Sequence, residues 1–336
     1  MRFREGQIAV SADIKQMFHQ VRVPEYDRDA FRFLWFPGGD LQAEAQVYRM
    51  CVHVFGATSS PSCAAFALRQ VAEEFKSEIP ADVIQAIKRN FYVDDCLRSM
   101  DDPMEAKQLV DRLTGVLARR GFKLTKWISS DPQVLAAVPE EQRSPSVTSF
   151  RIGDDLPQER ALGLTWDINE DAFCFQVPDR KIELTRRGVL SDVSSLYDPL
   201  GLVAPVLLPA KRLLQELCRD GLKWDERLPD ALADRWLDWR ERLSDLRRFR
   251  IPRCYGVGCS PTTPGIELHV FCDASESGYG ACAYLRRKTM DGTVVTVLVS
   301  RSTDQATNFT TTRITGCSSG RTFVATRSAR AYHQTR

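Results

Sequence analysis

The sequence lacks the features that would assign it to a secreted, membrane-spanning or thiolate-metal class. No stretch approaches the ~18 consecutive apolar residues of a membrane helix, and the N-terminus, from Met1 to Glu5, has no apolar signal-peptide core. The ten cysteines fall singly, without a C-x-x-C pair, and the four histidines share no ligand spacing, which favours reduced thiols over disulfides or zinc. Asp-Thr-Gly and Asp-Ser-Gly, the triplets of aspartic proteases, do not occur. We therefore expect an intracellular protein without a membrane partner.

The sequence also lacks a strong net charge of either sign. The formal charge is +2, although residues 301–336 hold six arginines against one acidic residue, Asp304. The net charge of residues 1–300 is therefore about −3. A nucleic acid would have to bind local basic patches, because the protein as a whole has no strong positive field. Arg247–Arg250 and Arg286–Lys288 are such patches, and a plain solvated surface is the alternative for each.

What is present is the 43% hydrophobic content of an ordinary globular protein, arranged in helix and strand periods. We expect strands over 7–13, 31–36, 47–54, 91–97, 122–128, 162–166, 173–177, 266–273, 279–286 and 293–300. We expect helices starting at Ser60-Pro61, over 82–89 and 102–120, and across 183–246. A segment rich in proline, glycine and cysteine, 251–265, is expected to be a linker.

Three aspartates stand where strands end or meet. Asp13 closes the first expected strand, and Asp94-Asp95 interrupts the apolar run 91–97. A surface turn is the plain alternative for the Asp-Asp pair, but two-residue turns prefer Asn-Gly or Asp-Gly. Nucleotidyl transfer with two Mg²⁺ ions needs carboxylates from separate strands at one sheet edge. The pattern therefore indicates a candidate metal site.

Five segments in a fixed order resemble the palm motifs of reverse transcriptases. They are S-A-D-I-K-Q-M-F-H-Q-V (11–21), F-G-A-T-S-S-P (55–61), F-Y-V-D-D (91–95), G-F-K-L-T-K-W (121–127) and L-G-L-T-W (162–166). Two later segments, L-Y-D-P-L-G-L-V-A-P (196–205) and L-K-W-D-E-R-L-P (222–229), are similar to the region downstream of the polymerase in BEL/Pao-type LTR retrotransposons. The resemblance covers roughly residues 1–300.

The resemblance implies roles for the carboxylates and for one aromatic residue. Asp13 and Asp94 would be the principal catalytic metal ligands, and Asp95 would be the third carboxylate. The cofactor would be two Mg²⁺ ions, with Mn²⁺ as an alternative. Phe18 matches a steric gate that excludes the ribose 2′-hydroxyl. A core aromatic on a short helix is the alternative for Phe18.

Two further nucleotide-binding residues follow from the resemblance. Gly56 would let backbone approach the incoming nucleotide and the template. Lys126 matches a lysine that would protonate or neutralise the leaving pyrophosphate, and a surface lysine is the alternative. The sequence departs from retroviral relatives at Phe55, which stands where they have glutamine. We interpret Phe55 as subgroup character, and no polar contact is assigned to that position.

A second domain and its limits are also expected. Glu267–Ser275 followed by Gly278–Ala281 resembles the first two strands of an RNase H domain, with Asp273 as its first metal carboxylate, although an aspartate ending a strand is commonplace. No glutamate follows Glu276, so we expect an incomplete nuclease site. The tail 302–336 lacks helical periodicity and is expected to be disordered or frame-shifted.

The sequence thus predicts an α+β architecture: a ferredoxin-like palm over 1–180 with the fingers largely missing, a helical thumb/connection over 181–250, a linker over 251–265 and a partial RNase H-like α/β unit over 266–301. We expect an RNA-directed DNA polymerase whose partners are a primed RNA or DNA template, deoxynucleoside triphosphates and other polyprotein segments, located in the cytoplasm (in virus-like particles) or in the nucleus. A catalytically inactive nucleic-acid-binding remnant and an unrelated metal-dependent phosphohydrolase are the alternatives.

Overall fold

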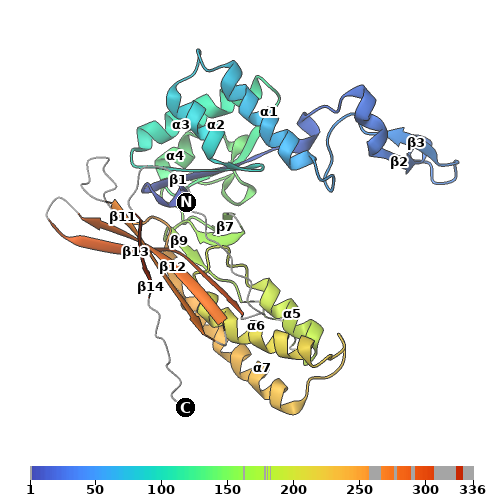
Figure 1. The fold of residues 1–336 in the computed structure, drawn as a ribbon. Coiled ribbons are helices and arrows are strands. Elements are labelled where there is room, and N and C mark those ends of the chain that lie inside the picture. The colour runs from blue at the N-terminus through green and yellow to red at the C-terminus, as the bar shows by residue number, and fades with distance from the viewer. Residues whose placement is uncertain are drawn as a thin grey trace. The chain divides into compact units, whose positions relative to one another are not determined.

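The chain divides into two compact units, Arg2–Pro157 and a second unit from Gln158 onward (Figure 1). The computed structural model describes residues 2–161, 163–177, 179, 181, 183–256, 266–275, 278–288, 292–305 and 323–327. In this described part, no helix combines the length and apolarity needed to cross a bilayer. The first unit ends before the expected palm boundary at 180, because the hairpin that follows pairs with residues farther downstream.

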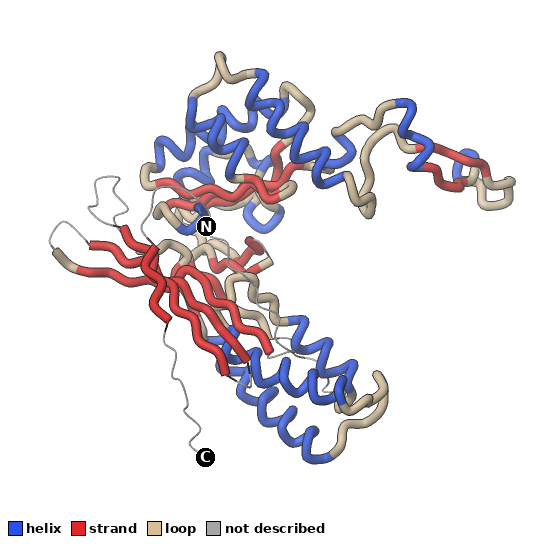
Figure 2. The backbone as a smooth tube through the Cα atoms, viewed as in Figure 1, coloured by secondary structure: helices blue, strands red, loops and turns tan. Residues whose placement is uncertain are grey.

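The first unit is built on a four-stranded antiparallel sheet of order β4-β5-β1-β6. Its strands are β1 (Ile8–Ile14), β4 (Phe91–Tyr92), β5 (Asp95–Met100) and β6 (Leu124–Ser129). Helices α1 (Ser60–Glu74) and α2 (Ala81–Arg89) connect β1 to β4, and α3 (Pro103–Ala118) connects β5 to β6 (Figure 2). This β-α-β-β-α-β order has the connectivity of a ferredoxin-like unit.

Local sequence explains where these helices begin. Asp102 caps α3, because its Oδ1 accepts a hydrogen bond from the Met104 backbone N–H at 2.9 Å, and Pro103 supplies the fixed φ of a first helical residue. A further short helix, α4 (Pro132–Ala137), follows β6 and is capped in the same way by Asp131. Apolar side chains of the sheet and helices form one core, which includes Val10, Ile14, Leu68, Val83, Leu109, Leu113, Leu124 and Trp127.

A two-stranded hairpin projects from the helical body of this unit (Figure 1). Its strands, β2 (Arg32–Trp35) and β3 (Gln46–Arg49), pair antiparallel, and all of their residues are exposed. The expected strands 31–36 and 47–54 are therefore present but shorter. Asp29 accepts ion-pair contacts from Arg32 and Arg49, which tie the two strands together at the base of the hairpin.

The second unit starts with a sheet of order β10-β9-β8-β7. Its strands are β7 (Gln158–Ala161), β8 (Leu164–Asp167), β9 (Ala172–Cys174) and β10 (Arg250–Pro252). Between β9 and β10 lie helices α5 (Arg186–Ser195), α6 (Ala204–Arg219) and α7 (Asp230–Arg242). β10 falls at the start of the expected linker 251–265, and residues 257–265 of that linker lie outside the described residues.

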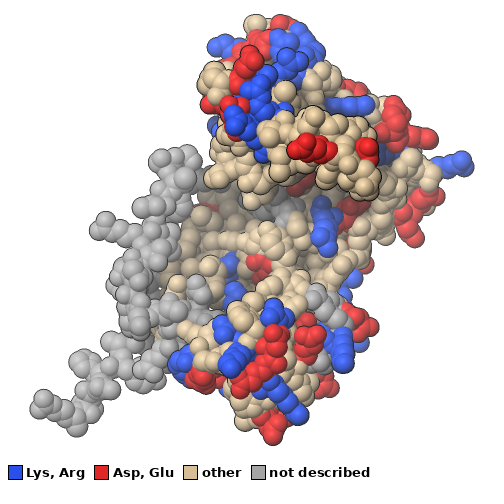
Figure 3. Space-filling model, turned by 90° about the vertical axis from the view of Figure 1, so that its right-hand side faces the viewer, with Lys and Arg blue, Asp and Glu red and all other residues tan. Residues whose placement is uncertain are grey.

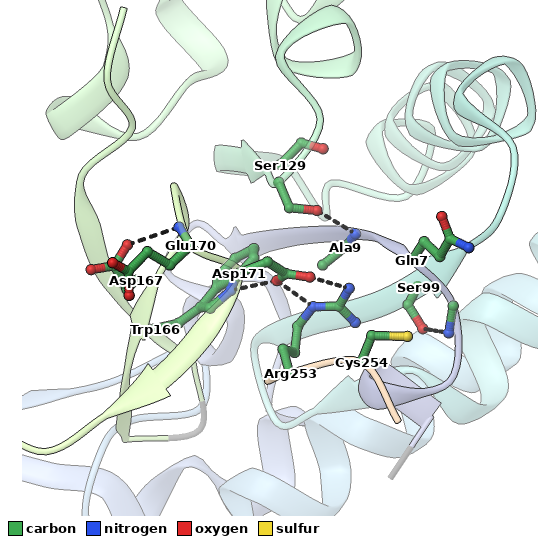
Figure 4. A network of polar contacts seen from close by, with 12 residues as sticks. Gln7, Ala9, Ser99, Ser129, Trp166, Asp167, Glu170, Asp171, Arg253 and Cys254 are labelled. Carbon is green, nitrogen blue, oxygen red and sulfur yellow. Dashed lines mark hydrogen bonds and ion pairs between the residues drawn. The ribbon is translucent and has the colours of Figure 1, made fainter. Parts of the chain in front are cut away.

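A partly buried ion pair links Arg253, directly after β10, to Asp171 in the β8–β9 turn (Figure 4). The Arg253 guanidinium donates to both carboxylate oxygens of Asp171, at 2.7 and 2.8 Å, and its side chain is 0% exposed. The Trp166 indole N–H also donates to Asp171, at 2.9 Å. These contacts explain why 158–174 belongs with the downstream unit rather than with the first sheet.

The last sheet has the order β13-β12-β11-β14. β11 (Ile266–Ser275), β12 (Gly278–Lys288) and β13 (Val294–Gln305) pair antiparallel, whereas β14 (Phe323–Arg327) runs parallel to β11. Residues 302–305 and 323–327 are therefore strand, in contrast to the structureless tail expected from 302. The remainder of that tail, 306–322 and 328–336, lies outside the described residues.

Candidate active site

Asp13 and Asp95 lie opposite each other on neighbouring antiparallel strands. They are cross-strand partners in the β1–β5 ladder, so their side chains are on the same face of the sheet. Asp94 precedes β5 directly, and its carbonyl accepts a hydrogen bond from the Ile14 backbone N–H at 2.9 Å. The sheet thus brings all three aspartates predicted from the sequence to one place.

The turn that carries Asp94 differs from the one expected. Tyr92 pairs with Asp95, so the two-residue loop is Val93-Asp94, and Asp95 already belongs to the strand. Val93 has a φ of 55°, a left-handed conformation that costs a β-branched residue about 1–2 kcal/mol. Strain of this kind is concentrated at functional sites. In the sequence, this strain is indicated by the absence of glycine and asparagine from the turn Val93-Asp94.

The three carboxylates repel one another. Burial, reinforced by the charges of Asp94 and Asp13, raises the pKa of Asp95 to about 6. Burial and the Asp13 charge also raise the pKa of Asp94, against the lowering effects of a backbone hydrogen bond and of Lys126. In such a cluster of partly buried carboxyl groups, each group is harder to ionise than a free one. A bound cation would offset the repulsion among the ionised carboxylates.

One cationic side chain contacts this cluster. The Lys126 ammonium lies 3.2 Å from Oδ2 of Asp13. The β1–β6 register shifts between Ser11 and Asp13, where two steps along β1 match three along β6, from Ile128 to Thr125. Lys126 is at this bulge with a φ of 57°. The bulge thus directs the lysine, as bulges beside active sites commonly do.

The donor set suits a hard divalent ion. Carboxylate oxygens are the ligands that Mg²⁺ prefers, and here two come from the adjacent strands β1 and β5 and one from the β4–β5 turn. Within the described ranges, no group of three or more Asp, Glu, His or Cys side chains is arranged so that it could hold a metal ion, and this applies to the three aspartates as they are placed here. The repulsion among Asp13, Asp94 and Asp95, which Lys126 offsets only in part, is the observation that fits these residues to a metal ion.

Phe18 and Gly56 are brought together through Phe55. Phe18 follows β1 in a short 3₁₀ helix, is 7% exposed and lies 4.8 Å from the Phe55 ring, centroid to centroid. Phe55 and Gly56 line a cavity of ≈ 690 Å³ beside the start of α1. Gly56 has a φ of 89°, and a Cβ there would meet open space, so its backbone conformation rather than crowding favours glycine. Phe18 also belongs to the hydrophobic core of the first unit, as the core-aromatic alternative requires.

Asp273 belongs to the second unit. It lies on β11 opposite Gly280 of β12, as the resemblance to two paired strands implied, and its residue is exposed. Its Oδ1 accepts a hydrogen bond from the Ala274 backbone N–H at 2.9 Å. Among the residues that the structure describes, no metal-ligand cluster includes it.

Charges of both signs are interspersed on the face seen in Figure 3. Several arginines near α3 are paired with acidic residues, including Arg119 with Glu78 and Arg120 with Glu74. The near-balanced composition is therefore reflected on this surface, without one continuous basic field.

Two family models match the chain. "Reverse transcriptase (RNA-dependent DNA polymerase)" matches residues 2–127, a range that contains the three aspartates, Phe18, Gly56 and Lys126. "Pao retrotransposon-like RNaseH-like domain" matches residues 185–315, from the start of the α5 region through β13. A search of curated proteins gave no match.

Proposed function

The chain is the reverse transcriptase region of a BEL/Pao-type retrotransposon polyprotein, and from this premise we propose that Asp13, Asp94 and Asp95 hold two Mg²⁺ ions for nucleotidyl transfer. The 3′-hydroxyl of a primer gives its proton to solvent water, and its oxygen attacks the α-phosphorus of a deoxynucleoside triphosphate. The bond to the pyrophosphate breaks, and the template, RNA or DNA, selects the base.

The observation that supports this proposal best is the pairing of Asp13 with Asp95 beside the Val93-Asp94 turn. Like charges placed directly opposite each other destabilise a sheet, and Val93 adds backbone strain. A sequence under selection for stability alone would avoid both features. Metal binding would explain why the sequence keeps both the like-charge pair and the strained turn.

Bound Mg²⁺ supplies charge neutralisation on the phosphates and lowers the pKa of the attacking hydroxyl. The chain's own residues do the rest. The aspartates would hold the ions, Lys126 would neutralise the leaving pyrophosphate, and Phe18 with Gly56 would form the wall on which the nucleotide's sugar and base are positioned. The first unit is accordingly proposed to be the polymerase palm, with α5–α7 as the thumb or connection.

The second unit extends the proposal to an RNase H-like fold. The antiparallel strands β11–β13 carry Asp273 on the first strand, in the range matched by the RNaseH-like model. We propose Asp273 as a nuclease carboxylate whose companion ligands are not among the described residues.

Primer extension tests the function. The purified chain is incubated with a primed RNA template, deoxynucleotides and Mg²⁺, beside the variants Asp13→Asn and Asp94→Asn. Because metal-held charge is worth several kcal/mol in the transition state, each variant should lose about 100-fold or more in rate. Asp111→Asn, an exposed residue on α3, is the matched control and should keep full activity.

The same assay separates the alternatives. Wild-type chain that binds primed template but does not extend it is a catalytically inactive remnant. Hydrolysis of a phosphate monoester without extension indicates a phosphohydrolase. Full extension by Asp94→Asn would refute the assignment of that carboxylate.

A further inference from the structure

Lys126 is positioned by its backbone rather than by packing of its side chain. The residue occupies the β6 bulge with left-handed φ, a conformation that lysine rarely adopts, and its side chain is 58% exposed. Asp13, its partner at 3.2 Å, is 25% exposed. The ammonium is therefore aimed at the carboxylates while its flexible stem remains free to move into solvent.

The ammonium stands where a cation is needed. Three carboxylates gather at this end of β1 and β5, and Lys126 lowers the pKa of both Asp94 and Asp95, although it forms its ion pair with Asp13. A divalent ion at the same carboxylates would supply the same compensation with twice the charge. The lysine and the ion would then compete for Asp13.

We propose that Lys126 is a positioning residue that substitutes for the metal in the metal-free protein: its ammonium holds Asp13 in place and is displaced when a divalent ion binds. This inference rests on the proposed polymerase function, because the ion is the metal of that reaction. Displacement also frees the ammonium from Asp13, so that it faces the pyrophosphate only when metal is bound.

A competing ion pair and a purely structural ion pair predict different effects of metal on stability. A structural pair stabilises the protein equally with and without metal. A competing pair stabilises only the metal-free protein and weakens metal binding. Because exposed ion pairs contribute little, the expected change in metal affinity is modest, about 1.5- to 5-fold.

The experiment measures Mn²⁺ binding to the full chain by electron paramagnetic resonance, and thermal unfolding in chelator and in excess Mg²⁺. Lys126→Met and Lys126→Gly should bind Mn²⁺ about 1.5- to 5-fold more tightly than wild type. Both should also gain more in melting temperature on adding Mg²⁺. Lys126→Gly keeps the left-handed bulge accessible, so it tests the charge even if the methionine variant fails to fold. Lys126→Arg, which keeps the charge, should bind Mn²⁺ as wild type does.

Lys88→Met is the matched control, because Lys88 on α2 forms an ion pair with Glu73 at 2.5 Å in the same unit and is not among the charges that shift the pKa of Asp94 or Asp95. It should leave Mn²⁺ affinity unchanged. Unchanged or weaker Mn²⁺ binding by both Lys126→Met and Lys126→Gly would overturn the proposal, even if the wild type extends primers. Absence of Mn²⁺ binding by the wild type itself, together with absence of extension, would overturn the proposed function as well.

Discussion

Asp13 of β1 and Asp95 of β5 are direct cross-strand partners, which places two carboxylates opposite each other in an antiparallel pair. Opposite-charge or apolar pairs would stabilise this position of the sheet, whereas like charges cost roughly 0.2–1 kcal/mol. Asp94 and Lys126 are the other charged groups that act on Asp95. This end of β1 and β5 thus concentrates negative charge at the expense of stability.

Replacing Asp95 by asparagine should stabilise the metal-free protein and change its pH dependence. The pKa of Asp95 is raised from 3.8 to about 6, so the folded protein retains a proton between these values that the unfolded chain has released. The stabilisation from that proton is complete below the unfolded value and is lost as the pH rises through about 6. At pH 7, Asp95→Asn should therefore be more stable by about 0.5–1 kcal/mol.

Urea unfolding in chelator across pH 4 to 8 measures this effect. The wild type should lose stability relative to Asp95→Asn as the pH rises through about 6. Parallel curves for the two proteins would show that Asp95 titrates normally. Asp101→Asn serves as a control, because Asp101 lies beyond the end of β5.

Substitutions at Val93 should reverse the usual ranking of alanine and glycine. Val93→Ala loses part of a half-buried side chain that packs on the core, yet keeps the cost of a left-handed backbone. Val93→Gly loses the same contacts but removes that cost. We expect the glycine variant to be more stable than the alanine variant by about 1 kcal/mol, measured by thermal unfolding of both. Greater stability of the alanine variant would argue against a strained turn.

Phe18→Ala should separate the two roles of that ring. If Phe18 excludes the ribose 2′-hydroxyl, removing the ring removes a clash, and ribonucleotide incorporation rises relative to deoxynucleotide. If Phe18 is only a core residue, the variant is destabilised by about 3–5 kcal/mol with an unchanged incorporation ratio. Single-nucleotide extension with competing ribo- and deoxynucleotides gives the ratio, and unfolding of the same preparation gives the stability. Phe75→Ala, another buried phenylalanine of this unit, controls for general loosening.

Asp171→Asn should destabilise the second unit. The substitution removes the carboxylate that pairs with the wholly buried Arg253 guanidinium. Removing one partner of a buried ion pair costs about 3 kcal/mol or more. Asparagine tolerates the left-handed φ of 46° at this position, so backbone strain does not contribute. Denaturant unfolding gives the measurement, and Asp167→Asn at the end of β8 should cost less than about 1 kcal/mol. Equal effects of the two substitutions would contradict the role given to the buried pair.

The sequence by itself determined the local structure well where caps and periodicity agree. Asp102-Pro103 and Gly121 bracket α3, and Ser60 begins α1, as their patterns predicted. Hydrophobic alternation also located β1 and β11. These signals work because capping and amphipathic burial depend on residues within one or two turns of the chain. The motif order likewise indicated the reverse transcriptase model that matches residues 2–127.

Tertiary structure alone decided the details of the candidate site and of the sheet edges. The opposition of Asp13 to Asp95, the bulge at Lys126 and the loop at Val93-Asp94 depend on the register between strands, which periodicity does not report. β10 and β14 were missed for the same reason, since their partners, β9 and β11, lie far away in the sequence. A short strand has too few residues to show a burial pattern. It joins a sheet because its backbone forms hydrogen bonds with the N–H and C=O groups of a neighbouring strand.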